Sequence, residues 1–379
     1  MDAVIARFAG NGLLRDDEMR TRFDLKRGVT GSSYGLVVGL IAIVALTATT
    51  GIGDSVQTLF TDVGDTLQDV SDTHAGTSGA EAAPSAVPSP SPLFSFTTHT
   101  LTTCGTSGRT GPLISACQSA YSTSWDSDSN NFAMPSQGMQ RFTVPATGTY
   151  TIEVAGAGNA GGYDGARLSA EFDLTQGDHL LIVVGQQGAD SRDGSGGSFV
   201  ALGSTQSSST ALIVGGGAGG HYTTAPNPER RNATFAEDAY YSLDSTTPTN
   251  YSGPTGTGGN GGGGYHGGGG GGFSSDGGCN NCDNWSPGES WGRAFVNGAN
   301  GGNYSYSGNP YRGGFGGGGA YHTAGNGGGG GGGYSGGRGG FSSSSHGWGG
   351  GSYTAPSAIN RQDLGIDSSG AGFVTITLN

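Results

Sequence analysis

Lysine is almost missing from this sequence, because Lys26 is the only lysine among 379 residues. After residue 28 the basic residues are ten arginines, set against 24 acidic residues. Without lysine, the body of the chain has neither a Schiff-base lysine nor a phosphate-binding loop of the P-loop type. With a net charge of −13, the chain repels nucleic acid and anionic lipid headgroups, so we expect no nucleic-acid partner.

Charge is absent from residues 29–53, which begin two positions after Lys26 and Arg27. An uncharged run longer than about 18 residues predicts a transmembrane helix. The preceding basic pair places the N-terminal end of this helix in the cytoplasm, so the chain after Gly53 would be exported. A secretory signal peptide is the rival interpretation, but its apolar core is usually shorter, at about 7–15 residues.

The apolar pattern continues beyond the uncharged run. Large apolar residues recur at spacings of three and four, which fits one stripe of a helix. They are Val56, Leu59, Phe60, Val63, Leu67 and Val70. A continuous helix over residues 29–72 would be about twice as long as a bilayer core is thick. We expect its second half to pack against copies of itself.

The start of this segment resembles a known family. Residues 28–41 read Gly-Val-Thr-Gly-Ser-Ser-Tyr-Gly-Leu-Val-Val-Gly-Leu-Ile and, with residues 53–60, resemble type IVb pilins of the Flp/Tad type. Ser33 stands where the family usually has glutamate, and this difference favours a minor or tip subunit over the bulk repeating subunit. The alternative is a plain single-span anchor that enters no filament.

The pilin resemblance implies how the chain is processed and what it contacts. A prepilin peptidase would cleave between Gly28 and Val29. The helix would then pack against other pilin subunits, with Tyr34, Gly35 and Gly39 at the contact and the glycines permitting close approach. The precursor would lie in the inner membrane with a cytoplasmic N-terminus, and the mature protein in an extracellular pilus at the cell surface.

Beyond the helix, the composition changes twice. Residues 73–92 are rich in Ala, Ser, Gly, Thr and Pro and predict a linker. Residues 93–214 alternate apolar and polar side chains, as in the run from Tyr150 to Val154. Short runs of this kind between Gly, Asp and Ser turns predict a β-sandwich, and residues 371–379 predict its closing strand.

Glycine concentrates between these strands, in residues 215–370, and residues 251–350 alone contain 43 of the 80 glycines. Glycine-rich sequence without a period is often disordered. Here aromatic residues punctuate the runs and strands bracket the segment. We therefore predict a bundle of extended polyglycine II helices, which have three residues per turn and bond laterally through their backbones.

Cysteine is scarce, with four residues in all: Cys104, Cys117, Cys279 and Cys282. An even count in an exported domain predicts two local disulfides, one in each pair. A zinc site would need four ligands at a recognisable spacing, and only one Cys-x-x-Cys is present. We therefore expect no metal and no cofactor.

A second resemblance covers the body of the chain. Its pieces are residues 142–150, 172–178, 182–188, 212–220 and 313–316. They resemble, from about Phe142 to the C-terminus, the glycine-rich extracellular domain of the anaplastic lymphoma and leukocyte receptor tyrosine kinases. Related modules occur in bacterial surface proteins and phage adhesins. The resemblance implies a small β-sandwich with a polyglycine II insertion, and a function in recognition.

Sequence signals for catalysis are weak. Residues 156–161 match G-x-G-x-x-G, but a strand follows where a dinucleotide site needs a helix. Residues 126–130 begin like a calcium loop, yet Asn131 and Gln137 occupy the positions that need glycine and a bidentate acid. The seven histidines have no evident orienting partner. We therefore predict that the chain is not an enzyme.

Together these patterns predict a long N-terminal transmembrane, pilin-like helix joined to an all-β sandwich with a polyglycine II bundle. The predicted function is a type IVb pilus subunit that presents a glycine-rich adhesive domain to an unknown surface or cell target. The alternatives are a membrane-anchored receptor and a purely structural filament coat. Candidate contact residues are aromatic, because Tyr and Trp dominate binding hot spots, although each could instead pack against the bundle. They are Trp285, Trp291, Tyr304, Tyr306, Tyr311 and Trp348.

Overall fold

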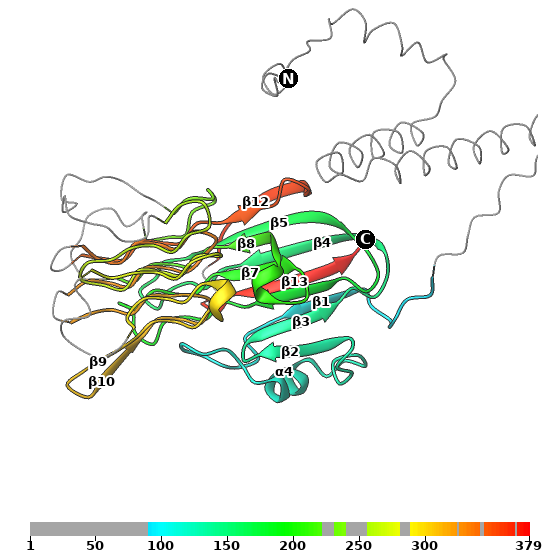
Figure 1. The fold of residues 1–379 in the computed structure, drawn as a ribbon, viewed down its shortest axis with the longest axis horizontal. Coiled ribbons are helices and arrows are strands. Elements are labelled where there is room, and N and C mark those ends of the chain that lie inside the picture. The colour runs from blue at the N-terminus through cyan, green and yellow to red at the C-terminus, as the bar shows by residue number, and fades with distance from the viewer. Residues whose placement is uncertain are drawn as a thin grey trace, which may run out of the picture. The chain divides into compact units, whose positions relative to one another are not determined.

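The computed structural model describes residues 90–221, 231–239, 256–280, 289–323, 326–341, 345–367 and 370–379 (Figure 1). These residues belong to one unit, Pro88–Asn379. Its strands form a five-stranded sheet in the order β1-β13-β4-β5-β12, a six-stranded sheet in the order β11-β8-β7-β6-β3-β2, and the hairpin β9-β10.

The five-stranded sheet consists of β1 (Thr98–Leu101), β4 (Gly148–Ala155), β5 (Gly165–Leu174), β12 (Ile359–Asp367) and β13 (Phe373–Leu378). The six-stranded sheet consists of β2 (Phe132–Ser136), β3 (Met139–Thr143), β6 (His179–Val183), β7 (Ser198–Leu202), β8 (Thr210–Gly215) and β11 (Tyr353–Thr354). The remaining elements are α4 (Ile114–Tyr121), the short 3-10 helices η1 (Gln206–Ser208) and η3 (Phe295–Asn297), and the hairpin strands β9 (Asn303–Tyr306) and β10 (Asn309–Arg312).

Alternation along β4 explains why the two sheets pack together. Tyr150, Ile152 and Val154 are fully buried, and the residues between them are partly exposed. Their cross-strand partners in β5 and β13, among them Phe172 and Ile376, are also buried. Side chains on one face of a sheet alternate with those on the other. This face therefore forms the core against the six-stranded sheet.

Strand β6 has buried side chains on both faces. Leu180 and Ile182 join the core between the two sheets. Leu181 and Val183 belong to a second apolar cluster, which also contains Phe295 and other residues of the glycine-rich segment. The six-stranded sheet is therefore covered on both sides, which suits the uninterrupted apolar sequence of β6.

The chain before β4 adds an aromatic layer to the core. Trp125 is almost fully buried, and its ring centroid lies 5.6 Å from that of Phe94 and 5.5 Å from that of Phe142. Helix α4 lies beside this layer and carries Cys117, which forms a disulfide with Cys104, with the two Cα atoms 4.9 Å apart. The layer and the disulfide hold residues 94–132 against the sandwich.

We expect removal of the Cys104–Cys117 disulfide to destabilise this layer. The bond joins residues separated by 13 positions, and closure of a loop of this length is worth about 3 kcal/mol in the unfolded chain. The measurement is urea denaturation of the double variant Cys104→Ser/Cys117→Ser beside the oxidised parent. An unchanged unfolding midpoint would show that the disulfide does not stabilise the fold.

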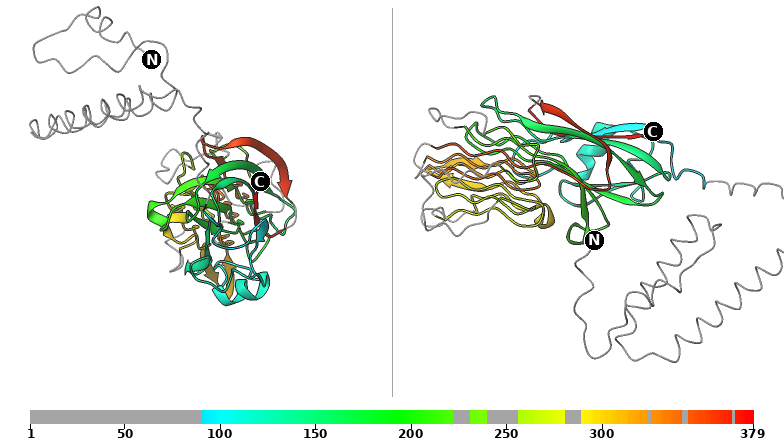
Figure 2. Two further views of the ribbon diagram at one scale, coloured as in Figure 1. Left: turned by 90° about the vertical axis from the view of Figure 1, so that its right-hand side faces the viewer. Right: turned by 90° about the horizontal axis from the view of Figure 1, so that it is seen from above.

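The glycine-rich segments run side by side from one end of the sheets (Figure 2). Consecutive backbone N–H groups of residues 329–333 donate to different neighbouring segments of the chain. N–H groups three residues apart donate to the same neighbouring segment. The donors and their carbonyl acceptors are Gly329 to Arg192, Gly330 to Gly268, Gly331 to Trp348, Gly332 to Ser195 and Gly333 to Gly271. A period of three is the period of an extended helix with three residues per turn, and it differs from the two-sided ladder of a β-sheet. We call this set of laterally bonded segments the glycine lattice.

The structure corrects the predicted fold class. The described part of the chain is mostly β-sheet, with a single α-helix of 8 residues and no long apolar helix. The physical reason is that its apolar residues alternate with a period of two or lie in the glycine lattice, so they fill sheet interfaces and form no helical stripe. Residues 29–72, on which the long helix was predicted, lie outside the described residues.

The predicted inner-membrane precursor and pilus are corrected as well. In the ranges that the structure describes, no helix has the length and apolarity needed to cross a membrane. The type IVb pilin assignment depended on such a helix, and the β-rich fold offers it no support. The predicted leader at residues 1–28 and the linker up to residue 89 also lie outside the described residues.

The glycine-rich insertion is shorter than the predicted range of residues 215–370. β11 pairs with β8 in the six-stranded sheet, and β12 pairs with β5 in the five-stranded sheet. The chain therefore returns to the sandwich at Tyr353. This return brings the last glycine-rich residues next to an edge of each sheet.

Candidate functional site

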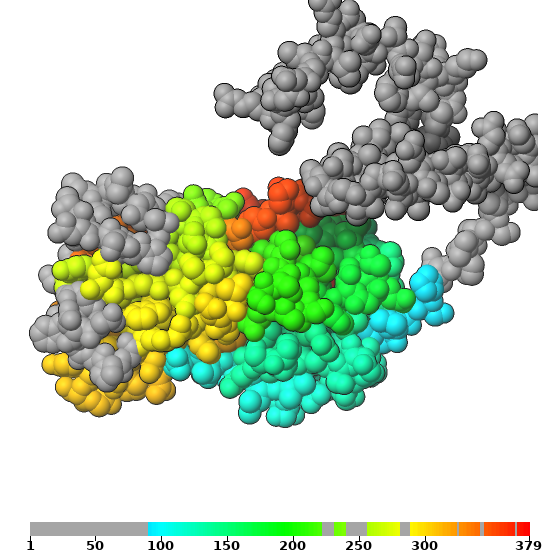
Figure 3. Space-filling view, viewed as in Figure 1, coloured from blue at the N-terminus to red at the C-terminus, as the bar shows by residue number. Residues whose placement is uncertain are grey.

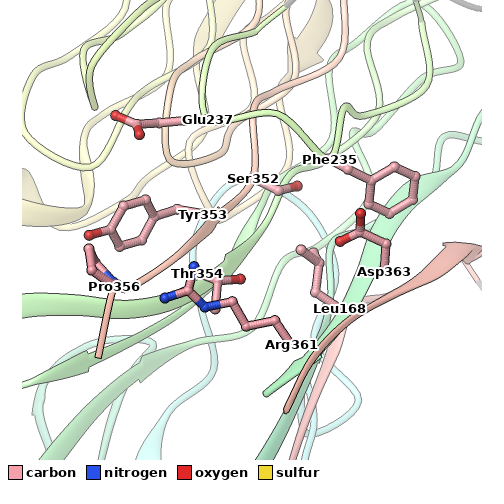
Figure 4. Close-up of a pocket in the computed structure, with 9 residues that line it drawn as sticks. All are labelled: Leu168, Phe235, Glu237, Ser352, Tyr353, Thr354, Pro356, Arg361 and Asp363. Carbon is pink, nitrogen blue, oxygen red and sulfur yellow. The ribbon is translucent and has the colours of Figure 1, made fainter. Parts of the chain in front are cut away.

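A pocket of about 440 Å³ lies where the chain returns to the sandwich (Figure 4). Side chains from β5, β11, β12 and residues 231–239 line it. The lining residues are Leu168, Phe235, Glu237, Ser352, Tyr353, Thr354, Pro356, Arg361 and Asp363. Its volume falls in the range of small-molecule and side-chain pockets, about 300–1,000 Å³. The mixture of aromatic, aliphatic and charged groups suits binding of a chemically mixed ligand.

Arg361 is held in place by the backbone. Its guanidinium donates to the carbonyl oxygen of Ala355 at 2.7 Å and to that of Ala358 at 3.2 Å. These bonds leave part of the five-donor guanidinium for a ligand while fixing its plane. Asp363 lies two residues further along β12 and also faces the pocket (Figure 4).

An aromatic stack supports the opposite wall. The rings of Tyr353 and Tyr334 are nearly parallel, with centroids 4.1 Å apart, and Phe273 stacks on the far side of Tyr334 at 6.0 Å. Burial raises the pKa of the Tyr334 hydroxyl, and the nearby Tyr353 and Glu237 raise it further. Tyr353 is thus fixed between the pocket and the glycine lattice.

The strand beside the pocket is unusually exposed. Among the strands that the structure describes, β12 lies at the end of its sheet and pairs only with β5, and eight of its nine residues are exposed. Ile359, Leu364 and Ile366 are 50%, 38% and 49% exposed as whole residues, and Phe235 is 36% exposed. Figure 3 shows β12 in orange-red at the rim of the surface.

Two register shifts bend β12, one between Ile359 and Gln362 and one between Asp363 and Gly365. Asn360, at the first shift, has a φ of 50° and donates through Nδ2 to Glu171 at 2.7 Å. Bulges of this kind re-aim side chains and occur often at sheet edges next to binding sites. Here they place Arg361 and Asp363 toward the pocket.

The candidate contact residues predicted from the sequence fall into three groups. Trp285, like Cys282, lies outside the described residues. Tyr304 and Trp348 are buried, Tyr304 with its ring centroid 4.1 Å from that of His322 and Trp348 beside the guanidinium of Arg338. These two pack within the glycine-rich part of the fold, so the structure assigns them a packing role.

The remaining contact candidates stay accessible to different degrees. Tyr306 is 50% exposed on the hairpin β9-β10. Tyr311 is partly buried and lies under the Arg192 guanidinium, 5.2 Å from its ring centroid, and Trp291 is partly buried. The hairpin therefore brings Tyr304, Tyr306 and Tyr311 together. Trp291 and Trp348 lie outside the hairpin.

Asp193 fixes the base of this hairpin. Its carboxylate is fully buried and accepts backbone N–H groups from Tyr321 at 2.8 Å, Arg312 at 3.1 Å and Asp190 at 3.1 Å. Burial raises the pKa of Asp193 to about 7, although the N–H donors act in the opposite direction. Because it joins three segments, Asp193 couples the hairpin to the glycine lattice.

The processing and helix-contact residues, Gly28, Val29, Tyr34, Gly35 and Gly39, lie outside the described residues. Cys279 is disulfide-bonded, and the described part of the chain has no free cysteine. The pocket residues Arg361, Asp363 and Phe235 were not predicted. The sequence near Arg361 and Asp363 has one feature typical of a strand, the apolar residues Leu364 and Ile366. Two apolar residues are too few to predict an edge strand.

Comparison with known proteins gives a partial similarity. No known protein family matches the chain. A stretch of 112 residues is 38% identical to the leukocyte tyrosine kinase receptor of Mus musculus. The stretch covers 28% of this chain and 13% of the receptor. The similarity supports the predicted receptor resemblance for that stretch, which is shorter than the span from Phe142 to the C-terminus on which we based it.

Proposed function

We propose that this part of the chain is a recognition domain that binds an extended segment of a partner protein along the free edge of β12. The observation that carries the proposal is that Ile359, Leu364 and Ile366 are exposed on the edge strand β12, which also contributes Arg361 and Asp363 to a pocket lined by the exposed Phe235. Charges and bulges limit unspecific pairing at sheet edges, and β12 has both, so its exposed apolar side chains are the feature that favours a specific partner.

An extended peptide satisfies both features of this site. Its backbone would pair with the open N–H and C=O groups of β12, and alternate side chains would lie over Leu364 and Ile366 or enter the pocket. Arg361, Asp363 and Glu237 would select charged or hydrogen-bonding groups at the pocket. The glycine lattice and the aromatic stack behind Tyr353 limit the ordering cost on binding, since the wall is already fixed.

Binding rather than catalysis is the proposed activity. The similar receptor spans far more than the matched stretch, so its kinase activity is not carried over to this chain. The described residues include no group of three or more His, Cys, Asp or Glu side chains able to hold a metal. The pocket lining contributes one arginine and two carboxylates, with no histidine or cysteine among the nine lining residues.

The proposal predicts that lysine on β12 abolishes peptide binding. A random peptide library displayed on phage is selected on the immobilised full-length chain, and the enriched peptides are titrated against Leu364→Lys and Ile366→Lys. Both residues are exposed on β12, and each lysine removes apolar contact and adds an unpaired charge. We expect at least about tenfold weaker binding, or about 1.4 kcal/mol.

The matched control is Leu93→Lys, because Leu93 is 53% exposed but lies outside β12 and the pocket lining. Binding should be unchanged in this variant. Equal binding by all three variants, or failure of any peptide to enrich, would contradict the proposal. A concentration-dependent dimer of the parent chain that the β12 lysines abolish would instead show that a second copy occupies the edge.

A further inference from the structure

Three arginines are gathered at the hairpin β9-β10 by backbone hydrogen bonds. The N–H of Gly301 donates to the carbonyl of Arg109 at 2.8 Å, and the Arg109 Nε donates back to the Gly301 carbonyl at 3.1 Å. The N–H of Arg293 donates to the carbonyl of Asn300 at 2.8 Å. Arg312 is the cross-strand partner of Asn303. Residues 300–303 thus bring all three arginines to one region.

Their charges are compensated unequally. Arg293 forms ion pairs with Asp276, at 2.6 Å, and with Glu289. Within the described residues, neither Arg109 nor Arg312 has a carboxylate at ion-pair distance. Burial lowers the pKa of Arg109 and the positive charge of Arg312 lowers it further, whereas the Glu289 carboxylate raises it and Arg293 lowers it. Among the described residues, the three guanidinium groups outnumber the two carboxylates of Asp276 and Glu289 in this region, and the excess positive charge attracts an anion.

The hairpin face that carries Arg312 also carries polar, neutral side chains. Asn303 and Ser305 share one face of β9, since residues two apart in a strand point to the same side. Their cross-strand partners Arg312 and Pro310 share that face. The half-exposed ring of Tyr306 belongs to the other face, next to the turn of the hairpin. The surface therefore combines guanidinium, amide and hydroxyl groups on a rigid hairpin.

We propose that Arg109 and Arg312 form a binding site for an anionic saccharide. A carboxylate or sulfate group would lie between the two guanidinium groups, which match the geometry of such anions through paired N–H donors. Ring hydroxyls beside the anionic group would bond to Asn303 and Ser305. An acidic peptide would share the charge but not the hydroxyl groups that these neutral side chains match.

The negative charge of the rest of the chain restricts anion binding to this site. With a net charge of −13, most of the protein repels anions, so an anion gains from approaching only where positive charge is uncompensated. The site shares no residue with the pocket beside β12. It is therefore an independent inference, and its failure would leave the peptide site untouched.

Titration calorimetry on the full-length chain tests the proposal. The probes are a sulfated, carboxylated hexasaccharide such as a chondroitin sulfate fragment, the unsulfated hexasaccharide hyaluronan, a neutral hexasaccharide and hexaglutamate. We expect binding of a charged saccharide, with affinity at least about tenfold lower in Arg109→Gln and in Arg312→Gln. Binding should also weaken as salt rises, and this dependence should be shallower in both variants.

Arg141→Gln is the matched control, because the Arg141 guanidinium donates to the carbonyl of Ser129 and lies on β3. Its affinity should stay within about twofold of the parent. The variants Arg109→Lys and Arg312→Lys keep the charge but lose the paired donors, and intermediate affinity is expected. Absence of saccharide binding, equal affinity in Arg312→Gln, or tighter binding of hexaglutamate would each overturn the proposal.

Discussion

Alanine at Gly332 is expected to destabilise the whole domain by at least about 3 kcal/mol. An added Cβ would lie 1.9 Å from the carbonyl oxygen of Gly316 and 2.8 Å from the carbonyl carbon of Gly317. Both are backbone atoms, so a rotamer change cannot relieve the clash. The Gly332 N–H and C=O are bonded to Ser195 and Gly217 in two further segments, so the backbone cannot shift freely either.

The matched control is Gly148→Ala in β4. There the nearest atom to an added Cβ is the terminal Cδ1 of Leu378, at 3.0 Å, which is the end of a flexible side chain. We expect a change below about 1 kcal/mol in the free energy of unfolding, measured by urea denaturation for both variants. Similar stability of the two variants would show that the glycine lattice is not closely packed.

Asparagine at Asp193 is expected to cost at least about 2 kcal/mol at pH 5. Both carboxyl oxygens of Asp193 accept backbone N–H groups, Oδ1 from Tyr321 and Oδ2 from Arg312 and Asp190. A protonated carboxyl keeps two oxygens that can accept, whereas an asparagine has one, because its amide nitrogen only donates. At least one of these backbone donors would lose its acceptor. Because these donors belong to segments that join the hairpin, the loss should also expose β9 and β10 to proteolysis.

The sign of the pH dependence follows from the raised pKa of Asp193, about 7 in the folded protein. Between about pH 4 and pH 7 the folded protein retains a proton that the unfolded chain has released, so the stability contribution of Asp193 falls as pH rises. The Asp193→Asn variant lacks this titration. The difference in free energy of unfolding between the parent and the variant should therefore decrease from pH 4 to pH 7. Denaturation curves at pH 4, 5, 6 and 7 measure the deficit.

Asp178→Asn provides the control, because Asp178 is partly exposed and accepts one backbone N–H, from Thr175 at 2.9 Å. Its substitution should change stability by less than about 1 kcal/mol. A deficit in Asp193→Asn that stays constant from pH 4 to pH 7 would contradict the assigned titration of Asp193.

The strands of the sandwich were predictable where their pattern was simple. The alternation of Tyr150, Ile152 and Val154 indicated a half-buried strand, and the structure has it as β4. The uninterrupted apolar run from Leu180 to Val184 suits a central strand, and β6 lies between β7 and β3 in the six-stranded sheet. In both cases burial follows directly from the period of the side chains.

The site was not predictable from the sequence for a physical reason. β12 is an exposed edge strand with two register shifts, so it has no regular apolar alternation to recognise. The contact candidates were chosen because they are aromatic, but residue type does not predict whether a side chain is exposed. Tyr304 and Trp348 are buried in the structure. Asp193 differs from Asp190 only in its tertiary surroundings, which bury one carboxylate and pair the other with Arg192.

Hydrogen–deuterium exchange of the full-length chain, with and without a peptide selected on it, is the most direct test of recognition at β12. The account predicts that the bound peptide slows amide exchange in residues 359–367 and in the adjoining residues 352–356, and leaves the hairpin β9-β10 unchanged. Protection elsewhere in the chain, with β12 exchanging as fast as in the free protein, would contradict it.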